Sequence, residues 1–256
     1  MNKVVKTTCL AAVASVFLAT VAFAQTSMTL TGPVSGPVYD GIYMSPYYAT
    51  VGGAANTPVI CDDFADDSNF NSTWNATVTS FSNINSKNTS WGLAGGNTSF
   101  YGAVGYLFGQ TLSAASGSVS QIVDSFEMWA IFDPTGVQNY LATTSAGAGA
   151  PISTSALCSE IFGACTTAAA LNPGGLLGAL EAQNYSASLF SNLIVLSSDN
   201  SNGTICAAGS HCAAQEFISL KAAEGGTTAA YLLLAGFCCF GAMFVHRRQL
   251  ASRTVA

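Results

Sequence analysis

The sequence predicts an α+β fold: a mainly antiparallel β-sheet or sandwich, two to three packed helices and one C-terminal transmembrane helix. Three observations carry this prediction. Short runs rich in Tyr, Val and Thr lie on both sides of a central region, apolar residues at helical spacing occupy that region, and an uncharged apolar run lies near the C-terminus. Groups of strands separated from groups of helices are typical of α+β domains.

The strands are recognised by alternation and by the turn residues between them. Runs rich in β-branched and aromatic residues favour strands, and an Asp-Gly pair such as Asp40-Gly41 is typical of a hairpin turn. Strands are predicted over Ser27–Gly32, within a hairpin spanning Gly36–Val51, and over Thr57–Phe64, Thr73–Phe81, Leu193–Leu196 and Gln215–Leu220. In the fourth of these, one face carries Trp74, Ala76, Val78 and Ser80.

Between the two groups of strands the apolar spacing changes to three and four residues, which indicates helices. One predicted face consists of Phe100, Ala103, Val104, Leu107 and Phe108. A second consists of Val119, Ile122, Val123, Phe126, Trp129 and Ala130. Asp133-Pro134 is expected to end the second helix because proline disfavours helical geometry in the preceding residue. A third helix is expected to begin at Asn172-Pro173, whereas Asn83–Gly96 and Leu141–Ser155 are predicted loops.

The N-terminus has the pattern of a secretory signal peptide. Lys3 and Lys6 precede a short apolar segment, and Ala-Phe-Ala ending at Ala24 matches a signal peptidase site. Cleavage is therefore predicted between Ala24 and Gln25, with an uncleaved anchor as the alternative. The predicted organisation is a signal peptide over 1–24, an exported domain over 25–222 and a sorting region over 223–256.

The C-terminal region is expected to enter a membrane. Thr227–Val245 is uncharged and long enough to span the hydrocarbon core of a bilayer, about 30 Å. Arg247 and Arg248 follow it directly, so the positive-inside rule places them in the cytoplasm and the domain outside. The protein is thus expected to be exported and anchored to the inner membrane at least transiently, and then to reach the cell surface or the extracellular space.

The charge distribution excludes nucleic-acid binding. All 13 acidic residues lie between Asp40 and Glu224, where only Lys87 and Lys221 carry positive charge. The exported part therefore carries a net charge of about −11 and has no basic patch to displace counterions from phosphate.

The cysteines predict two disulfides and one remainder. Five of the 8 cysteines lie in the predicted exported domain. The close spacings favour the pairs Cys158–Cys165 and Cys206–Cys212 in an oxidising compartment. This pairing leaves Cys61 over. Zinc binding is the alternative role for these cysteines. Neither pair has the C-x-x-C spacing typical of zinc sites, however, and His211 is the only imidazole nearby.

Two other patterns leave alternatives open. Asp62, Asp63, Asp66 and Asp67 are calcium candidates because oxygen ligands at close spacing suit that ion, although a solvated acidic turn explains them equally simply. A Ser-His-Asp hydrolase would need His211 as its base, and the chain has no G-x-S-x-G nucleophile motif. A glycosidase-type carboxylate pair stays open, since folding rather than spacing creates such pairs. No cofactor is predicted.

The C-terminal tail resembles the bacterial PEP-CTERM sorting signal, in which a short motif precedes one membrane span and an arginine cluster. Glu224, Gly225 and Gly226 occupy the motif, although both prolines of the Pro-Glu-Pro form are absent. The resemblance implies recognition by an exosortase-type processing enzyme that cleaves near the motif. A plain tail anchor is the alternative.

The predicted exported domain resembles a domain often carried by such proteins, through VICDDF (Val59–Phe64), MWAIFDP (Met128–Pro134) and QEFI (Gln215–Ile218). The first two of these segments also resemble the thioester domains of bacterial surface adhesins. That resemblance implies a strand cysteine, here Cys61, bonded to a glutamine in a Q-x-A-Φ-W helix as a covalent trap for a host or matrix nucleophile.

The helix motif departs from that pattern at two positions. Trp129 fits the tryptophan, but Ser125 occupies the glutamine position and Glu127 the alanine position. A serine cannot supply the acyl group, and Gln121 lies about 6 Å further along the helix axis. Cys61 is therefore predicted to be a vestigial thioester position.

These observations predict a non-enzymatic, exported, surface- or matrix-associated structural or adhesive protein. Its expected partners are signal peptidase, an exosortase-type enzyme, the membrane and a polysaccharide matrix such as that of a biofilm. A degenerate thioester-type adhesin domain that binds a specific surface ligand is the alternative, and a secreted hydrolase is a further one.

Overall fold

The computed structural model describes residues 24–32, 38–39, 41–64, 66–147, 149–164, 175–183, 185–200, 202–210 and 214–221. Contacts divide the chain into two units, Met1–Leu220 and Lys221–Ala256, and every element below belongs to the first.

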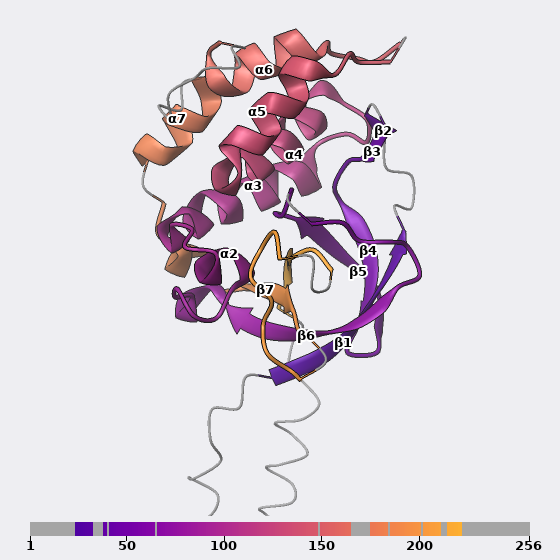
Figure 1. Cartoon of the computed structure of the whole chain (residues 1–256), viewed down its shortest axis with the longest axis vertical. Helices are drawn as coiled ribbons and strands as arrows, with labels where there is room; N and C mark the ends of the chain where they lie inside the picture. Colours follow the sequence, from indigo (N-terminus) through magenta and orange to yellow (C-terminus); the bar gives the residue numbers. More distant parts are fainter. Residues whose placement is uncertain are drawn as a thin grey trace, which may run out of the picture. The chain divides into compact units, whose positions relative to one another are not determined.

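Six antiparallel strands close into a barrel in the order β1-β4-β5-β8-β7-β6 (Figure 1). They are β1 (Ala24–Gly32), β4 (Tyr47–Val51), β5 (Ala54–Cys61), β6 (Thr73–Ser80), β7 (Leu193–Ser198) and β8 (Phe217–Leu220). A separate hairpin pairs β2 (Val38–Tyr39) with β3 (Ile42–Tyr43), and Asp40 of the predicted turn lies outside the described residues. The α+β prediction is confirmed, but the sheet closes on itself instead of forming an open sheet or sandwich, and closure removes free sheet edges.

One apolar cluster draws on all six strands and fills the barrel. It contains Met28, Leu30, Tyr47, Ala49, Val59, Cys61, Ala76, Ile194, Leu196 and Phe217, with Trp74 and Val78 packed against it. The face predicted for the fourth strand from Trp74, Ala76 and Val78 therefore faces the interior. Successive strand residues point to opposite faces, so the residues between these point out of the barrel.

The helices pack together beside the barrel (Figure 1). They are α2 (Ser90–Leu93), α3 (Tyr101–Ser113), α4 (Val119–Phe132), α5 (Pro134–Thr143), α6 (Thr154–Phe162) and α7 (Gly175–Gln183). Short 3-10 segments occupy η1 (Phe81–Asn83), η2 (Thr98–Phe100) and η3 (Ala187–Phe190). The two apolar faces predicted for α3 and α4 are confirmed except at Val119, which is exposed, and both belong to one buried cluster.

The predictions of loops over Asn83–Gly96 and Leu141–Ser155 were wrong in part, because the first contains α2 and the second contains the end of α5 and the start of α6. The side chain of Asp133 accepts a hydrogen bond from the Gly136 N–H, and Pro134 takes the first position of α5. The residues that end α4 therefore also begin α5, because aspartate caps a helix and proline suits its first turn.

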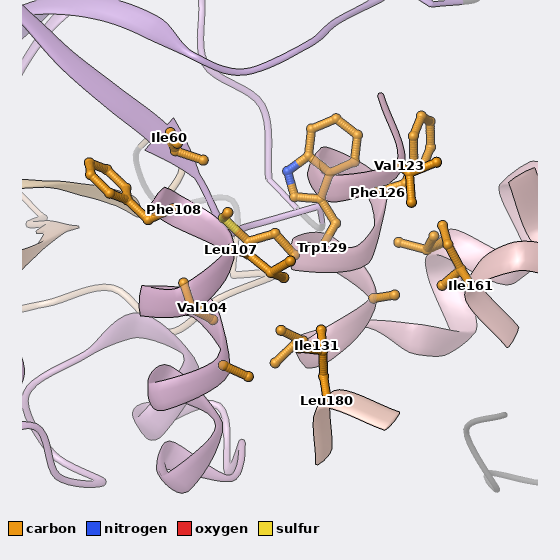
Figure 2. Packing of buried hydrophobic residues seen from close by; sticks show 14 of the residues in the cluster. Ile60, Val104, Leu107, Phe108, Val123, Phe126, Trp129, Ile131, Ile161 and Leu180 are labelled. Carbon is orange, nitrogen blue, oxygen red and sulfur yellow. The ribbon is translucent and has the colours of Figure 1, made fainter. Parts of the chain in front are cut away.

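The second apolar cluster joins the outer face of the barrel to the helices. Ile60 of β5, Val195 of β7 and Ile218 of β8 belong to it together with side chains of α3, α4, α6 and α7. Figure 2 shows Ile60 near Leu107 and Phe108 of α3, with Trp129 of α4 facing them. The last residues of β5, the whole of β7 and the first residues of β8 are therefore buried on both faces, between two cores.

Candidate functional site

A cysteine and a glutamine meet at the end of the barrel where β5 stops and β8 starts. The last residue of β5, Cys61, is paired with the first residue of β8, Phe217. Gln215 lies two residues before Phe217, so the alternation of an extended chain directs its side chain to the face that carries Phe217 and Cys61. Antiparallel pairing thus brings together two side chains that are far apart in the sequence.

One backbone carbonyl oxygen links these two side chains. The Cys61 thiol donates a hydrogen bond to the Asp63 carbonyl oxygen at 3.0 Å, and Nε2 of Gln215 donates to the same oxygen at 2.9 Å. The Asp63 backbone N–H donates in turn to Sγ of Cys61 at 3.3 Å. The thiol and the side-chain amide are therefore neighbours around a single oxygen atom.

Two tryptophans hold the backbone at the end of β5. Nε1 of Trp129, on α4, donates to the Cys61 carbonyl oxygen at 3.0 Å, and Nε1 of Trp91, on α2, donates to the Asp62 carbonyl oxygen at 3.2 Å. Both rings are buried. Each hydrogen bond satisfies a buried carbonyl group, whose exposure to an apolar environment without a partner costs about 1–3 kcal/mol.

The thiol of Cys61 is neutral and shielded from water. The residue is 0% exposed. Burial, followed by the negative charges of Asp63 and Asp62, raises the pKa of this thiol well above its usual range. Gln215 is only partly buried, so the glutamine side of the pair reaches the protein surface while the sulfur does not.

A fully buried carboxyl pair lies behind the thiol and the glutamine. Asp62 and Glu216 are both 0% exposed. Glu216 accepts hydrogen bonds from the Ser90 backbone N–H at 2.6 Å and from the hydroxyls of Tyr101 and Ser197. Neither carboxyl oxygen of Asp62 has a donor among the described residues. Burial, then the charge of Glu216, raises the pKa of Asp62 well above its usual range, and burial also raises the pKa of Glu216.

Further hydrogen bonds tie the segment after β5 to the segment before β8. The Gln215 backbone N–H donates to Oγ of Ser68 at 2.9 Å. The Gly209 N–H donates to Oδ2 of Asp66 at 2.7 Å, and the Asp66 N–H donates to Oδ1 of Asp63 at 3.3 Å. These contacts hold the two segments that carry the cysteine and the glutamine side by side.

The helix positions that the sequence singled out do not supply this glutamine. Oε1 of Gln121 accepts from the Gly117 N–H at 2.7 Å, so its side chain caps the start of α4. Ser125 is buried and donates to the Gln121 carbonyl oxygen at 2.8 Å. Trp129, which fits the tryptophan of the motif, donates to the carbonyl oxygen of Cys61. Gln215 was missed as a reactive candidate, although it opens the QEFI segment, which was noted for its resemblance.

Glu127, which stands at the alanine position of the resembled motif, is a second kind of buried acid. It is 3% exposed, and one of its carboxyl oxygens has no hydrogen-bond partner among the described residues. Burial, followed by the charges of Asp124 and Glu160, raises its pKa to about 8. Burial likewise raises the pKa of Asp124 to about 6.

The four calcium candidates take different positions. Asp62 belongs to the carboxyl pair, and Asp66 accepts from the Gly209 N–H. Asp67 is exposed, whereas Asp63 is buried. Within the described ranges no group of three or more His, Cys, Asp or Glu side chains is arranged to hold a metal ion.

The cysteines fall into two states in the part of the chain that the structure describes. Cys158 and Cys206 are disulfide-bonded. Cys61 is the free cysteine. Cys165 and Cys212, the predicted partners, lie outside the described residues, so the pairing itself stays a prediction.

The predicted processing sites lie at or beyond the edges of the described chain. Ala24 and Gln25 are the first residues of β1, and the Gln25 side chain donates to Oδ2 of Asp199 and to the Gly203 carbonyl oxygen, each at 3.1 Å. The rest of the signal peptide, Glu224–Gly226, the span 227–245, Arg247 and Arg248 lie outside the described residues. None of the described helices has both the length and the apolar character needed to cross a membrane.

Comparison with known proteins identifies no relative. No family model matches the chain, and no curated protein or solved structure shows a significant match to it. A proposal for its function therefore depends on the geometry around Cys61 and Gln215 and on the signals at the two ends of the sequence.

Proposed function

We propose that the protein is an exported, surface- or matrix-associated adhesive protein whose barrel forms an internal thioester between Cys61 and Gln215 and uses it to bind a target covalently. The observation that carries the proposal is the shared hydrogen-bond acceptor, because it holds a buried thiol beside a side-chain amide. The chain acts once as a covalent binder and is not a catalyst with turnover.

Formation of the thioester needs no cofactor and no oxidant. The sulfur of Cys61 attacks the side-chain carbonyl carbon of Gln215 and forms a carbon–sulfur bond. The carbon–nitrogen bond of the amide breaks, and the nitrogen leaves as ammonia with the thiol proton. Reactants held in place in this way avoid much of the entropic cost of bringing two groups together.

Capture of a target reverses the roles of the two side chains. An amine or hydroxyl of the target attacks the acyl carbon on Gln215, the carbon–sulfur bond breaks, and the target's proton passes to sulfur. The target is then joined to Gln215 by an amide or ester bond, and Cys61 is again a thiol. Partial exposure of Gln215 supports access by the target.

The burial of Cys61 supports a long-lived thioester before capture. Cys61 is 0% exposed, so little water lies beside the sulfur to solvate a departing thiolate. The raised pKa of the thiol also makes the thiolate a reluctant leaving group, which slows hydrolysis. The proposal also gives a role to Cys61, which is a free cysteine in a chain that is expected to be exported.

The ends of the sequence support the proposed location. A signal peptide, a tail resembling a PEP-CTERM signal and a strongly acidic exported region are expected of a protein handed from the inner membrane to the surface or matrix. Signal peptidase and an exosortase-type enzyme are the proposed processing partners. Polysaccharide hydroxyls or amines of matrix proteins are the proposed targets.

The test is mass spectrometry of the exported protein. We expect the loss of one ammonia, about 17 Da, beyond the hydrogens lost to disulfides, with a cross-link between the peptides that contain Cys61 and Gln215. Methylamine should then add to the Gln215 side chain and release one thiol at Cys61.

Matched variants locate the bond. Cys61→Ser and Gln215→Ala should abolish the cross-link, whereas Gln121→Ala should retain it. The peptide map is essential because Gln25, once it becomes the N-terminal residue, also releases ammonia when it cyclises. A wild-type protein with a free Cys61 thiol and an intact Gln215 amide would overturn the proposal in favour of non-covalent adhesion.

A further inference from the structure

We infer that Asp62 and Glu216 share one proton and act as positioning residues that keep the Cys61 thiol beside the Gln215 side chain, and that loss of this proton separates the two. The inference rests on the proposed thioester for its role in function. It concerns the two residues that directly follow the reacting side chains in the sequence.

The two carboxyl groups lie on the opposite face of the β5–β8 pair from the thiol. Cys61 and Phe217 belong to the cluster inside the barrel, whereas Ile60 and Ile218 belong to the cluster between barrel and helices. Alternation therefore directs Asp62, two residues after Ile60, and Glu216, two residues before Ile218, toward the helices. A change in the carboxyl pair acts directly on the backbone that carries Cys61 and Gln215.

Glu216 joins four elements at this point. Its carboxylate accepts from the Ser90 N–H at the start of α2, the Tyr101 hydroxyl of α3 and the Ser197 hydroxyl of β7, while its own backbone leads into β8. Three donors stabilise the ionised form of one carboxyl group. No comparable donor set surrounds Asp62 among the described residues.

The register that pairs Cys61 with Phe217 sets Asp62 opposite Glu216, so both buried carboxyl groups face the region between the barrel and the helices. Two buried carboxylates at opposite positions of a strand pair repel each other, so one of them keeps its proton well above the usual pH. The unfolded carboxyls release their protons near pH 4, whereas the folded pair keeps one. The free energy of unfolding attributable to this pair thus decreases as pH rises above about 4 and stops decreasing once the folded pair has lost its proton.

The neighbouring groups also favour retention of one proton by the Asp62–Glu216 pair. On the β5 side Asp63 adds negative charge, and burial keeps the Cys61 thiol neutral. On α3 the buried Tyr101 has a raised pKa and stays neutral. From α2 Glu216 meets the Ser90 N–H and from β7 the Ser197 hydroxyl, whereas the indole from α4 binds the adjacent Cys61 carbonyl oxygen. No cation among these groups offsets a second negative charge.

The decisive variant is Asp62→Asn, because an amide donates to Glu216 permanently and does not titrate. Its matched control is Asp67→Asn, which removes an exposed carboxyl from the same segment. Infrared difference spectra at neutral pH should show that Asp62→Asn removes a protonated-carboxyl band, whereas Asp67→Asn does not. Protonated Glu127 contributes to each spectrum equally and cancels.

The positioning role is measured in the Gln215→Ala background, in which no thioester can form. The rate at which a thiol reagent modifies Cys61 should rise with pH more steeply when Asp62 is present than in the Gln215→Ala, Asp62→Asn double variant. The ratio of the two rates should grow by about tenfold for each pH unit above the pKa of the pair. An unchanged ratio, or an unchanged infrared band, would contradict the inference.

A separate measurement keeps the two proposals distinct. In the wild-type protein the lifetime of the thioester should shorten at high pH. In Asp62→Asn the only pH dependence left should be that of the hydrolysis common to both proteins. A pH-dependent thiol in the Gln215→Ala background together with no thioester in the wild type would refute the proposed function alone. A thioester whose lifetime ignores Asp62→Asn at every pH would refute the positioning role alone.

Discussion

The two faces of the β5–β8 pair differ in how they bury chemically demanding groups. The interior face carries Cys61 and Phe217, and it keeps the sulfur neutral within apolar surroundings. The opposite face carries Asp62 and Glu216, and it accepts one negative charge because three donors surround it. Adjacent residues of one strand thus occupy environments of opposite character.

This difference shows what strand alternation makes available to a protein. A buried thiol needs only exclusion of water to stay neutral, whereas a buried carboxylate needs donors that offset its lost hydration. Both requirements are met within two residues because a closed barrel has one core inside it and a second core between its wall and the helices. The predictions below test each face separately.

The largest effect is expected on the interior face. Phe217→Ala removes a ring that is 0% exposed and contacts Tyr47 and Trp74 edge-to-face or tilted. The cavity should lower the free energy of unfolding by about 3–5 kcal/mol in denaturant titrations. Leu220→Ala on the same strand is the control, since Leu220 is 42% exposed and should lose far less. Equal losses would show that the interior of the barrel is not tightly packed.

A smaller effect is expected on the face that carries the carboxyl pair. Tyr101→Phe removes one of the three donors to Glu216 and preserves the ring. A hydrogen bond to a charged group contributes about 1.5–3 kcal/mol, so the free energy of unfolding should decrease by this amount at neutral pH. Tyr106→Phe, a change at a tyrosine of the same helix, should have little effect. A neutral Tyr101→Phe variant would indicate that Glu216 is not ionised.

The third effect has the opposite sign, a gain, and concerns a buried acid without such a donor network. Glu127 has a pKa of about 8. The unfolded group ionises near pH 4, so its contribution to stability is present at low pH and is lost between about pH 4 and pH 8. Glu127→Gln should remove this loss and raise the free energy of unfolding at pH 8 by up to about 4 kcal/mol, with no gain near pH 4.

The pH dependence of that gain is the diagnostic measurement. Glu160→Gln is the control, because Glu160 is exposed and acts on Glu127 only through its charge. It should change stability by much less over the same pH range. A gain from Glu127→Gln that is the same at pH 4 and pH 8 would mean that the carboxyl is not the titrating group.

Much of the fold could be predicted because its signals are local. The apolar faces of α3 and α4, the interior face of β6 and the buried run in β7 each repeat within one segment. The starts of α5 and α6 could not be predicted in the same way. Asp133-Pro134 at the start of α5 also signals the end of a helix, and Ser153 at the start of α6 lies in a segment typical of a loop. Asp133 caps α5 and Ser153 caps α6, and a capping residue is also a turn residue.

Only part of the candidate site, Cys61 and Trp129, could be predicted from the sequence. Cys61 was singled out because the two disulfide pairs leave it over, and Trp129 through its motif. No sequence pattern marked Gln215 as a reactive residue, because the resembled motif places its glutamine on the helix that contains Ser125. Its place beside the thiol follows from the pairing of Cys61 with Phe217.

The sequence by itself determined the positions of the barrel strands and of α3 and α4, the apolar faces of these helices, where the charges lie and which cysteine is left without a nearby partner. These properties depend on residues that are neighbours along the chain. Only the tertiary structure decided that the sheet closes into a barrel and that β8 inserts between β5 and β7. That choice depends on pairing across more than a hundred residues, which no local periodicity encodes, and it alone brings Gln215 to Cys61 and Glu216 to Asp62.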